Sequence, residues 1–151
     1  MRIIPLLLVL LLLANTDASA AERLGRDVTT AGLAGSFVRP DGSGPAKAVL
    51  MIAGSGPTDR NGNSRLGVDA NYLEMLAGHL AGANIASLRY DKRGVGGSKA
   101  LVTSEATLRF SDFVGDAATW RNWLHGQPGI SCIFLLGHSE GGLIATRVAE
   151  K

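Results

Sequence analysis

Beyond its first twenty residues, the chain alternates between continuous apolar runs and segments in which apolar residues recur at helical spacing. Continuous apolar runs occupy residues 48–53 and 132–136, a further short strand is predicted at residues 85–90, and each of the three is followed by a glycine-rich segment. Runs of this length are typical of strands buried on both faces of a parallel sheet. An earlier stretch, residues 28–38, is interrupted by Gly32-Leu33-Ala34-Gly35 and predicts a hairpin or strand pair.

Two amphipathic helices are predicted between these strands. The first covers residues 69–81, with Asp69 as N-cap and Gly82 as the stop, and the second covers residues 110–125. A further helix is expected to start at about Leu143, directly after the run 132–136. Strands that alternate with helices favour right-handed crossovers and a mostly parallel sheet, so the predicted class is α/β. The apolar faces comprise Tyr72, Leu73, Leu76, Ala77 and Leu80 in the first helix and Phe113, Ala117, Trp120 and Leu124 in the second.

The N-terminus has the features of a secretory signal peptide. Met1-Arg2 precedes an apolar stretch, residues 3–14, and Ala18-Ser19-Ala20 provides small residues at the positions that signal peptidase requires. The sequence therefore predicts a signal peptide at residues 1–20, a single exported domain that starts near Ala21, and a periplasmic or secreted protein. An uncleaved anchor is the alternative interpretation.

Charge and cysteine content narrow the possible partners. The 15 basic and 13 acidic residues give a net charge of +2 and form no run, so nothing indicates a nucleic-acid partner. No membrane span is expected after residue 20, and the sequence leaves the oligomeric state open. Cys132, the single cysteine, lies in an apolar run and is expected to be a small buried hydrophobe.

The segment Gly137-His138-Ser139-Glu140-Gly141 fits the pattern G-x-S-x-G between a predicted strand and a predicted helix. Small residues on both sides allow the sharp turn that exposes a nucleophilic serine. In that arrangement Ser139 is the nucleophile, and the N–H of Glu140 is one donor of the oxyanion hole. The alternative is a glycine-rich turn that carries an unreactive serine.

Gly54-Ser55-Gly56-Pro57 follows the first apolar run. In a hydrolase whose nucleophile lies in a G-x-S-x-G turn, this position provides the second oxyanion donor. The N–H of Ser55 is the first candidate and that of Gly56 the second, and a plain turn is the alternative. A dinucleotide site is disfavoured, because Ser139 stands where G-x-G-x-x-G requires glycine. Neither a metal nor an organic cofactor is expected.

Three motifs together resemble the exported esterase and serine-aminopeptidase-like branch of the α/β-hydrolase superfamily. They are residues 54–63 (GSGPTDRNGN), residues 89–98 (RYDKRGVGGS) and residues 137–142 (GHSEGG). The resemblance implies an α/β-hydrolase fold and carboxylesterase-like hydrolysis of carboxylic esters, with thioesters or amides as variants. It also implies that Asp91 and Arg93 brace the loops. One departure is Asn61, where that branch usually has aspartate.

The chain order in this fold is serine, then acid, then histidine. No histidine follows His138, and neither His79, His125 nor His138 is placed to act as the base on Ser139. The 151 residues are therefore expected to be the N-terminal part of the domain, nearly inactive alone, with the acid, the histidine and later strands elsewhere. An amidase, peptidase or thioesterase at the same site is one alternative function, and a non-catalytic binding protein is another.

Overall fold

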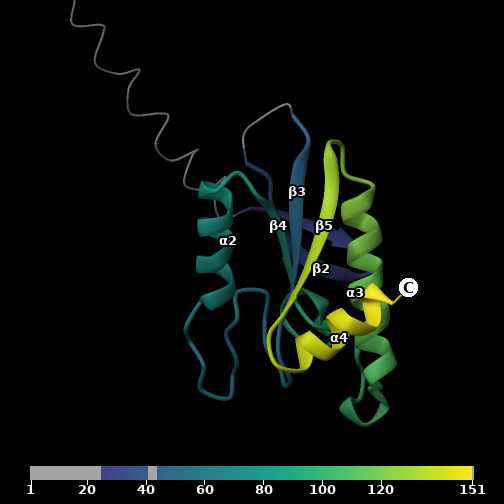
Figure 1. Cartoon of the computed structure of the whole chain (residues 1–151). Coiled ribbons are helices and arrows are strands. Elements are labelled where there is room, and N and C mark those ends of the chain that lie inside the picture. The colour runs from purple at the N-terminus through teal and green to yellow at the C-terminus, as the bar shows by residue number, and fades with distance from the viewer. Residues whose placement is uncertain (1–24, 41–43, 151) are drawn as a thin grey trace, which may run out of the picture.

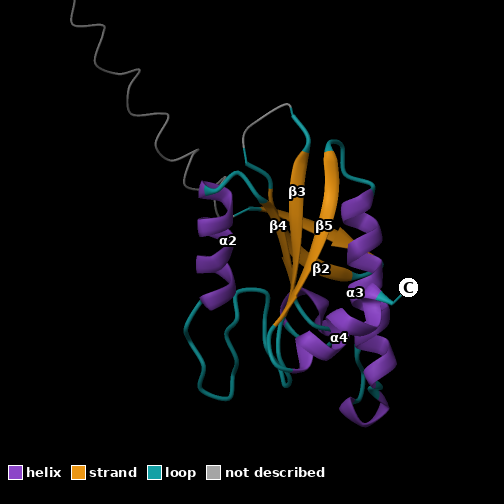
Figure 2. Cartoon of the chain, viewed as in Figure 1, coloured by secondary structure: helices purple, strands orange, loops and turns teal. Residues whose placement is uncertain are grey.

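The computed structural model describes residues 25–40 and 44–150, which form a mixed sheet with helices on both faces. Figures 1 and 2 show α2 on one side of the sheet and α3 and α4 on the other. The strands are β1 (Arg26–Thr30), β2 (Leu33–Val38), β3 (Ala46–Ile52), β4 (Ala86–Tyr90) and β5 (Ile130–Gly137). The helices are α2 (Tyr72–Gly82), α3 (Phe110–His125) and α4 (Glu140–Ala149), with 3-10 turns η1 (Gly96–Leu101) and η2 (Glu105–Thr107).

The sheet order is β1-β2-β4-β3-β5. β1 pairs with β2 and β2 with β4 in antiparallel fashion, whereas β3 is parallel to both β4 and β5. The carboxyl ends of β3, β4 and β5 therefore meet at one edge of the sheet, which is the lower edge in Figure 1. Loops at this edge can present polar groups to a common ligand.

Side chains of β3 alternate between two hydrophobic cores. Val49 and Met51 pack with Leu73 and Ala77 of α2 on one face. The intervening Ala48, Leu50 and Ile52 pack on the opposite face with α3 and α4, around the fully buried Trp120. Because successive strand residues point to opposite faces, a strand between two helical layers must be apolar throughout, which explains the continuous run.

The structure confirms the predicted elements and shifts some of their ends. The early strand pair is present, but the chain turns at Ala31 and Gly32, where φ is 48° and 79°, while Ala34 and Gly35 belong to β2. α3 has the predicted bounds. The predicted N-cap of the first helix was wrong: Asn71, with φ 48°, occupies that position instead of Asp69. The side-chain oxygen of Asn63 holds this start, accepting from the N–H groups of Ala70 and Asn71 at 3.0 and 2.9 Å.

The prediction that Cys132 is buried was wrong. Cys132 is exposed, and Phe134, two residues further along β5, is 50% exposed. Both residues lie on the α2 face of the sheet, and in the described residues α2 lies chiefly against β4, with Val49 and Met51 of β3 in the core beneath it. An apolar run therefore identified the strand but not the side chains that a helix covers.

The predicted signal peptide, residues 1–20, lies outside the described residues. Among the helices of residues 25–40 and 44–150, none has the length and apolar character needed to cross a bilayer.

Candidate active site

Ser139 lies at the turn between β5 and α4 in an unusual backbone conformation. Its φ of 53° and ψ of −121° fall outside the regions that a side chain normally permits. The residue is exposed at the carboxyl edge of the sheet. Such conformations store strain and persist only where the surrounding packing imposes them. This is the backbone geometry expected of a nucleophile elbow.

Close packing of glycines imposes the elbow (residues 137–141). A Cβ on Gly137 would overlap the carbonyl of Gly141, and a Cβ on Gly141 would overlap the carbonyl of Ile52 in β3. The N–H of His138 also donates to the Ile52 carbonyl at 3.0 Å. The turn is thus pressed against the neighbouring parallel strand, at a separation that only glycine allows.

Glu140 is the first residue of α4, so its N–H group has no carbonyl one turn earlier in the helix. The N–H groups of Gly141 and Gly142 donate to the carbonyls of His138 and Ser139, both at 2.9 Å. Within the described part of the chain, no acceptor is recorded for the Glu140 N–H. This donor lies at the positive end of the helix dipole, directly after Ser139.

The loop that follows β3, in which the sequence predicts the second oxyanion donor, lies against the elbow. A Cβ built on Gly54 would lie 3.0 Å from His138 Nδ1 and 3.4 Å from the Cβ of Ser139. The next two residues, Ser55 and Gly56, are exposed, and Gly56 has φ 78°. No acceptor for their N–H groups is recorded among the described residues. The structure therefore brings Ser55, Gly56 and Glu140 to one place.

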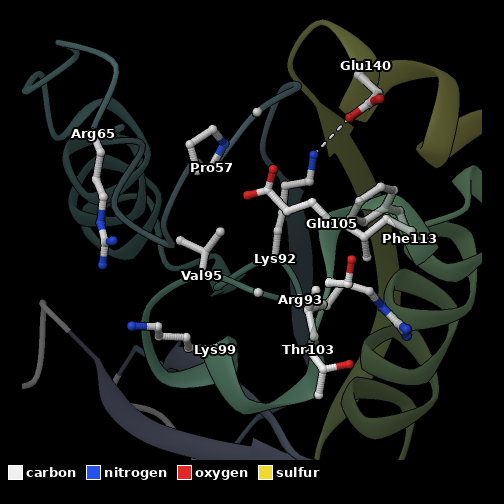
Figure 3. Close-up of a pocket in the computed structure, with 15 residues that line it drawn as sticks. Pro57, Arg65, Lys92, Arg93, Val95, Lys99, Thr103, Glu105, Phe113 and Glu140 are labelled. Atoms are coloured by element: carbon white, nitrogen blue, oxygen red, sulfur yellow. Dashed lines mark hydrogen bonds and ion pairs between the residues drawn. The ribbon is translucent and has the colours of Figure 1, made fainter.

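Lys92, which the sequence analysis did not single out, joins these two segments. Its ammonium group donates to the carbonyl of Gly54 at 3.0 Å and to Glu140 Oε2 at 2.8 Å, and Figure 3 draws the second contact. The Phe113 ring lies beneath the ammonium group, with its centroid 4.4 Å from Nζ. Lys92 is only 4% exposed. The sequence shows that Lys92 belongs to a loop motif, but it does not predict the direction in which the side chain points.

His138 turns away from the elbow toward α2. Its Nδ1 lies 3.3 Å from the hydroxyl of Tyr72, and the two rings meet edge to face at 5.3 Å. Burial, with a smaller contribution from the charge of Asp59, raises the pKa of Tyr72, so its phenol is neutral at physiological pH and can donate to His138. This contact agrees with the prediction that His138 is not the base acting on Ser139.

Asp91 and Arg93 brace loops, as the resemblance implied. Asp91 accepts from the backbone and guanidinium of Arg60 at 2.8 Å, and Arg60 also contacts Asp27, a set called here the Arg60 cluster. Burial by itself lowers the pKa of Arg60. The hydrogen bond and charge of Asp91, together with the charge of Asp27, raise it by more than this, so the net shift is upward. Arg93 pairs with Asp116 of α3, whose hydrogen bond raises the pKa of Arg93.

Asn61, the departure from the usual aspartate, has a defined contact. Its side-chain oxygen accepts from Arg89 Nε at 3.1 Å. Arg89 also pairs with Glu74 of α2 at 3.3 Å, so a carboxylate is still supplied to this arginine from another element. The neutral amide at residue 61 therefore fits the local structure.

A cavity of about 510 Å³ lies beside the elbow, and Figure 3 shows the residues that line it. Its wall includes Gly56 of the loop after β3 and Glu140 of α4, with Phe113, Val95 and Leu108 as apolar surface. Ser139 does not line this cavity, which approaches the elbow through Glu140. The volume is in the range of small-molecule sites. Across residues 25–40 and 44–150, no cluster of three or more potential metal ligands is found.

Comparisons with known proteins agree with this geometry. The profile of the family described as serine aminopeptidase, S33 matches residues 64–151. Esterase EstD of Thermotoga maritima is 31% identical over 127 residues, which are 83% of this chain and 29% of that protein.

Two solved structures share the fold. An alpha-beta serine hydrolase homologue from Coxiella burnetii superposes with a TM-score of 0.60 at 21% identity, covering 82% of this chain and 56% of that one. Est1E of Butyrivibrio proteoclasticus, solved with ferulic acid, superposes with a TM-score of 0.57 at 16% identity, covering 80% of this chain and 45% of that one. The chain thus spans less than two thirds of each of these relatives. Because the family profile matches more than half of the chain, the protein belongs to the serine aminopeptidase S33 family of the α/β-hydrolase superfamily.

Proposed function

We propose that the complete protein is a serine esterase in which Ser139 attacks the carbonyl carbon of a small carboxylic ester. The observation that carries the proposal is the strained backbone of Ser139, with φ 53° and ψ −121°, at the packed junction of β5 and α4. EstD, the curated relative, is named as an esterase, which favours esters over amides as the substrate class.

The proposed reaction is acyl transfer in two steps. Ser139 Oγ adds to the ester carbonyl as its proton passes to a base, and the N–H groups of Glu140 and of Ser55 or Gly56 stabilise the oxyanion. Collapse expels the alcohol, which takes that proton, and leaves an acyl-serine. Water then adds to the acyl-serine, and the carboxylic acid departs as Ser139 regains its proton.

The base is proposed to lie in a part of the protein that these 151 residues do not cover. No histidine follows His138 in the sequence, and the chain spans 29% to 56% of its relatives. Serine hydroxyls are weak nucleophiles without an oriented base. We therefore expect the product of the complete reading frame to hydrolyse esters and the 151-residue chain alone to be nearly inactive.

The test is hydrolysis of p-nitrophenyl butyrate by the complete protein and its Ser139→Ala variant. The variant should lose at least about 10³-fold in kcat/KM, as when other serine hydrolases lose their nucleophile. Ser111→Ala, at an exposed position of α3, is the matched control and should retain full activity. A fluorophosphonate probe should add its mass to the peptide that contains Ser139. Activity that survives in Ser139→Ala would reject the proposal.

The alternative activities share this site and differ in the leaving group. A panel of aminoacyl p-nitroanilides and acyl thioesters, assayed beside the esters, separates an amidase or thioesterase from an esterase. If the complete protein binds ligands but turns over none of these substrates, a non-catalytic binding protein is favoured instead.

We also propose export, on the basis of the charged and apolar order of residues 1–20. N-terminal sequencing of the protein recovered from the periplasm or medium should find a start near Ala21. Recovery of the protein only from the cytoplasm, with Met1 retained, would contradict the proposal.

A further inference from the structure

We propose that Lys92 is a positioning residue of the oxyanion hole, an inference that rests on the proposed function. Lys92 follows β4, yet its ammonium group contacts the two segments that carry the proposed donors. One contact is the carbonyl of Gly54, the residue before Ser55, and the other is the side chain of Glu140, the residue after Ser139. A single side chain therefore fixes the distance between both sides of the hole.

The environment of Lys92 makes this link rigid. The residue is 4% exposed, and its ammonium group has an acceptor at 3.0 Å, another at 2.8 Å and the Phe113 ring at 4.4 Å. A buried ammonium group without partners would be strongly unfavourable, so the three groups must keep their places around it. Figure 3 shows the Lys92 side chain pointing from the loop after β4 toward Glu140.

The link also has an electrostatic role. The carboxylate of Glu140 is 30% exposed and belongs to the same residue whose N–H is the proposed donor. An unpaired carboxylate there would oppose the negative charge that develops on the substrate oxygen. Lys92 neutralises that carboxylate and leaves the N-terminus of α4 electropositive. Both effects act on the transition state more than on substrate binding.

The experiment compares Lys92→Met with wild type in the complete protein, using p-nitrophenyl butyrate. We expect kcat to fall about 10- to 100-fold while KM changes by less than about threefold, since misplaced donors weaken mainly the transition state. Affinity for an alkyl trifluoromethyl ketone, which forms a tetrahedral adduct with the serine, should fall in parallel with kcat/KM. An unchanged kcat, or an equal loss of affinity for substrate and ketone, would overturn the inference.

Arg121→Met is the matched structural control. Arg121 of α3 donates to the carbonyl of Val148 at 2.9 Å and so holds the opposite end of α4 from Lys92. This variant should lower thermal stability without the selective loss of kcat. If Arg121→Met reduces kcat and ketone affinity as much as Lys92→Met does, then Lys92 has only a structural role and the inference fails.

Glu140→Gln provides a second variant in case Lys92→Met does not fold. The amide keeps the size and one acceptor but removes the negative charge, so the contact with Lys92 weakens while Gly54 keeps its partner. Because this variant also removes the charge that Lys92 neutralises, only the loss of positioning can lower kcat, so a fall of about threefold or more with unchanged KM supports the inference, and an unchanged or higher kcat contradicts it. Ser139→Ala separates the two proposals: its inactivity beside a fully active Lys92→Met rejects the role of Lys92 alone, and its activity rejects the esterase itself.

Discussion

The elbow and the Arg60 cluster lie at the same edge of the sheet, but different kinds of interaction hold them. Backbone packs on backbone in the elbow, where Gly137 and Gly141 leave no room for a Cβ. In the Arg60 cluster, side-chain charges make the contacts: Asp91 accepts from Arg60 and from the N–H of Gly97, both at 2.8 Å. The elbow therefore requires residues without a side chain, whereas the Arg60 cluster requires particular charged side chains.

Asp91 and Lys92 show this difference between neighbours in the sequence. Both are nearly buried, at 3% and 4% exposed, but they point to different partners. Asp91 turns to Arg60 and joins the loops after β3 and β4, whereas Lys92 turns to Glu140 and Gly54. Successive residues of an extended chain point to opposite sides, so one short motif serves both the bracing of loops and the site.

The largest expected effect comes from Gly141→Ala. The added Cβ would overlap the carbonyl of Ile52 and lie 2.8 Å from that of Ala53, so strand or helix must move. We expect a loss of about 4 kcal/mol or more in the free energy of unfolding, or failure to fold. Urea denaturation followed by circular dichroism measures the change.

The adjacent glycine is the control for that comparison. A Cβ on Gly142 has only the carbonyl of Gly137 near it, at an ordinary 3.7 Å. Because alanine favours a helix over glycine, Gly142→Ala should be neutral or stabilise by about 0.5–1 kcal/mol. Equal destabilisation by both variants would show that close packing with β3 is not what holds the elbow.

Asp91→Asn should have the second largest effect. The amide replaces one acceptor with a donor facing Arg60, and removal of one charge from a buried pair typically costs about 3–5 kcal/mol. The same urea titration applies. Glu150→Gln is the control, because its pair with Arg147 is exposed on both sides, at 53% and 56%, and should contribute less than about 0.5 kcal/mol. Similar losses for both variants would contradict the assigned role of the Arg60 cluster.

Much of the fold could be predicted because burial on two faces leaves a signal in the sequence. β3 lies between two helical layers and reads as a continuous apolar run, and α3 begins and ends where its apolar face predicted. The start of α2 was misplaced because the side chain of Asn63 fixes it, through contacts that span seven and eight residues of loop. Loop contacts of this kind have no periodicity to read.

The candidate site was predicted only in part. The motif around Ser139 specified the turn, because glycine spacing reflects a local backbone requirement. The link from Lys92 to Glu140 joins residues 48 positions apart, and the exposure of Cys132 depends on which strands α2 covers. Both are properties of the assembled sheet, so they became visible only in three dimensions.

The smallest expected effect comes from Tyr72→Phe, which tests a support of the elbow that uses a side chain. The substitution removes the hydroxyl 3.3 Å from His138 Nδ1 but keeps the ring that packs edge to face on the imidazole. One half-exposed hydrogen bond contributes about 0.5–1 kcal/mol, so unfolding and kcat should change little. Tyr72→Ala also removes the ring and should cost about 2 kcal/mol. If the two variants lose the same free energy of unfolding, the hydrogen bond and not the ring holds α2 against the elbow. Polar side-chain contacts would then stabilise the elbow as they do the Arg60 cluster.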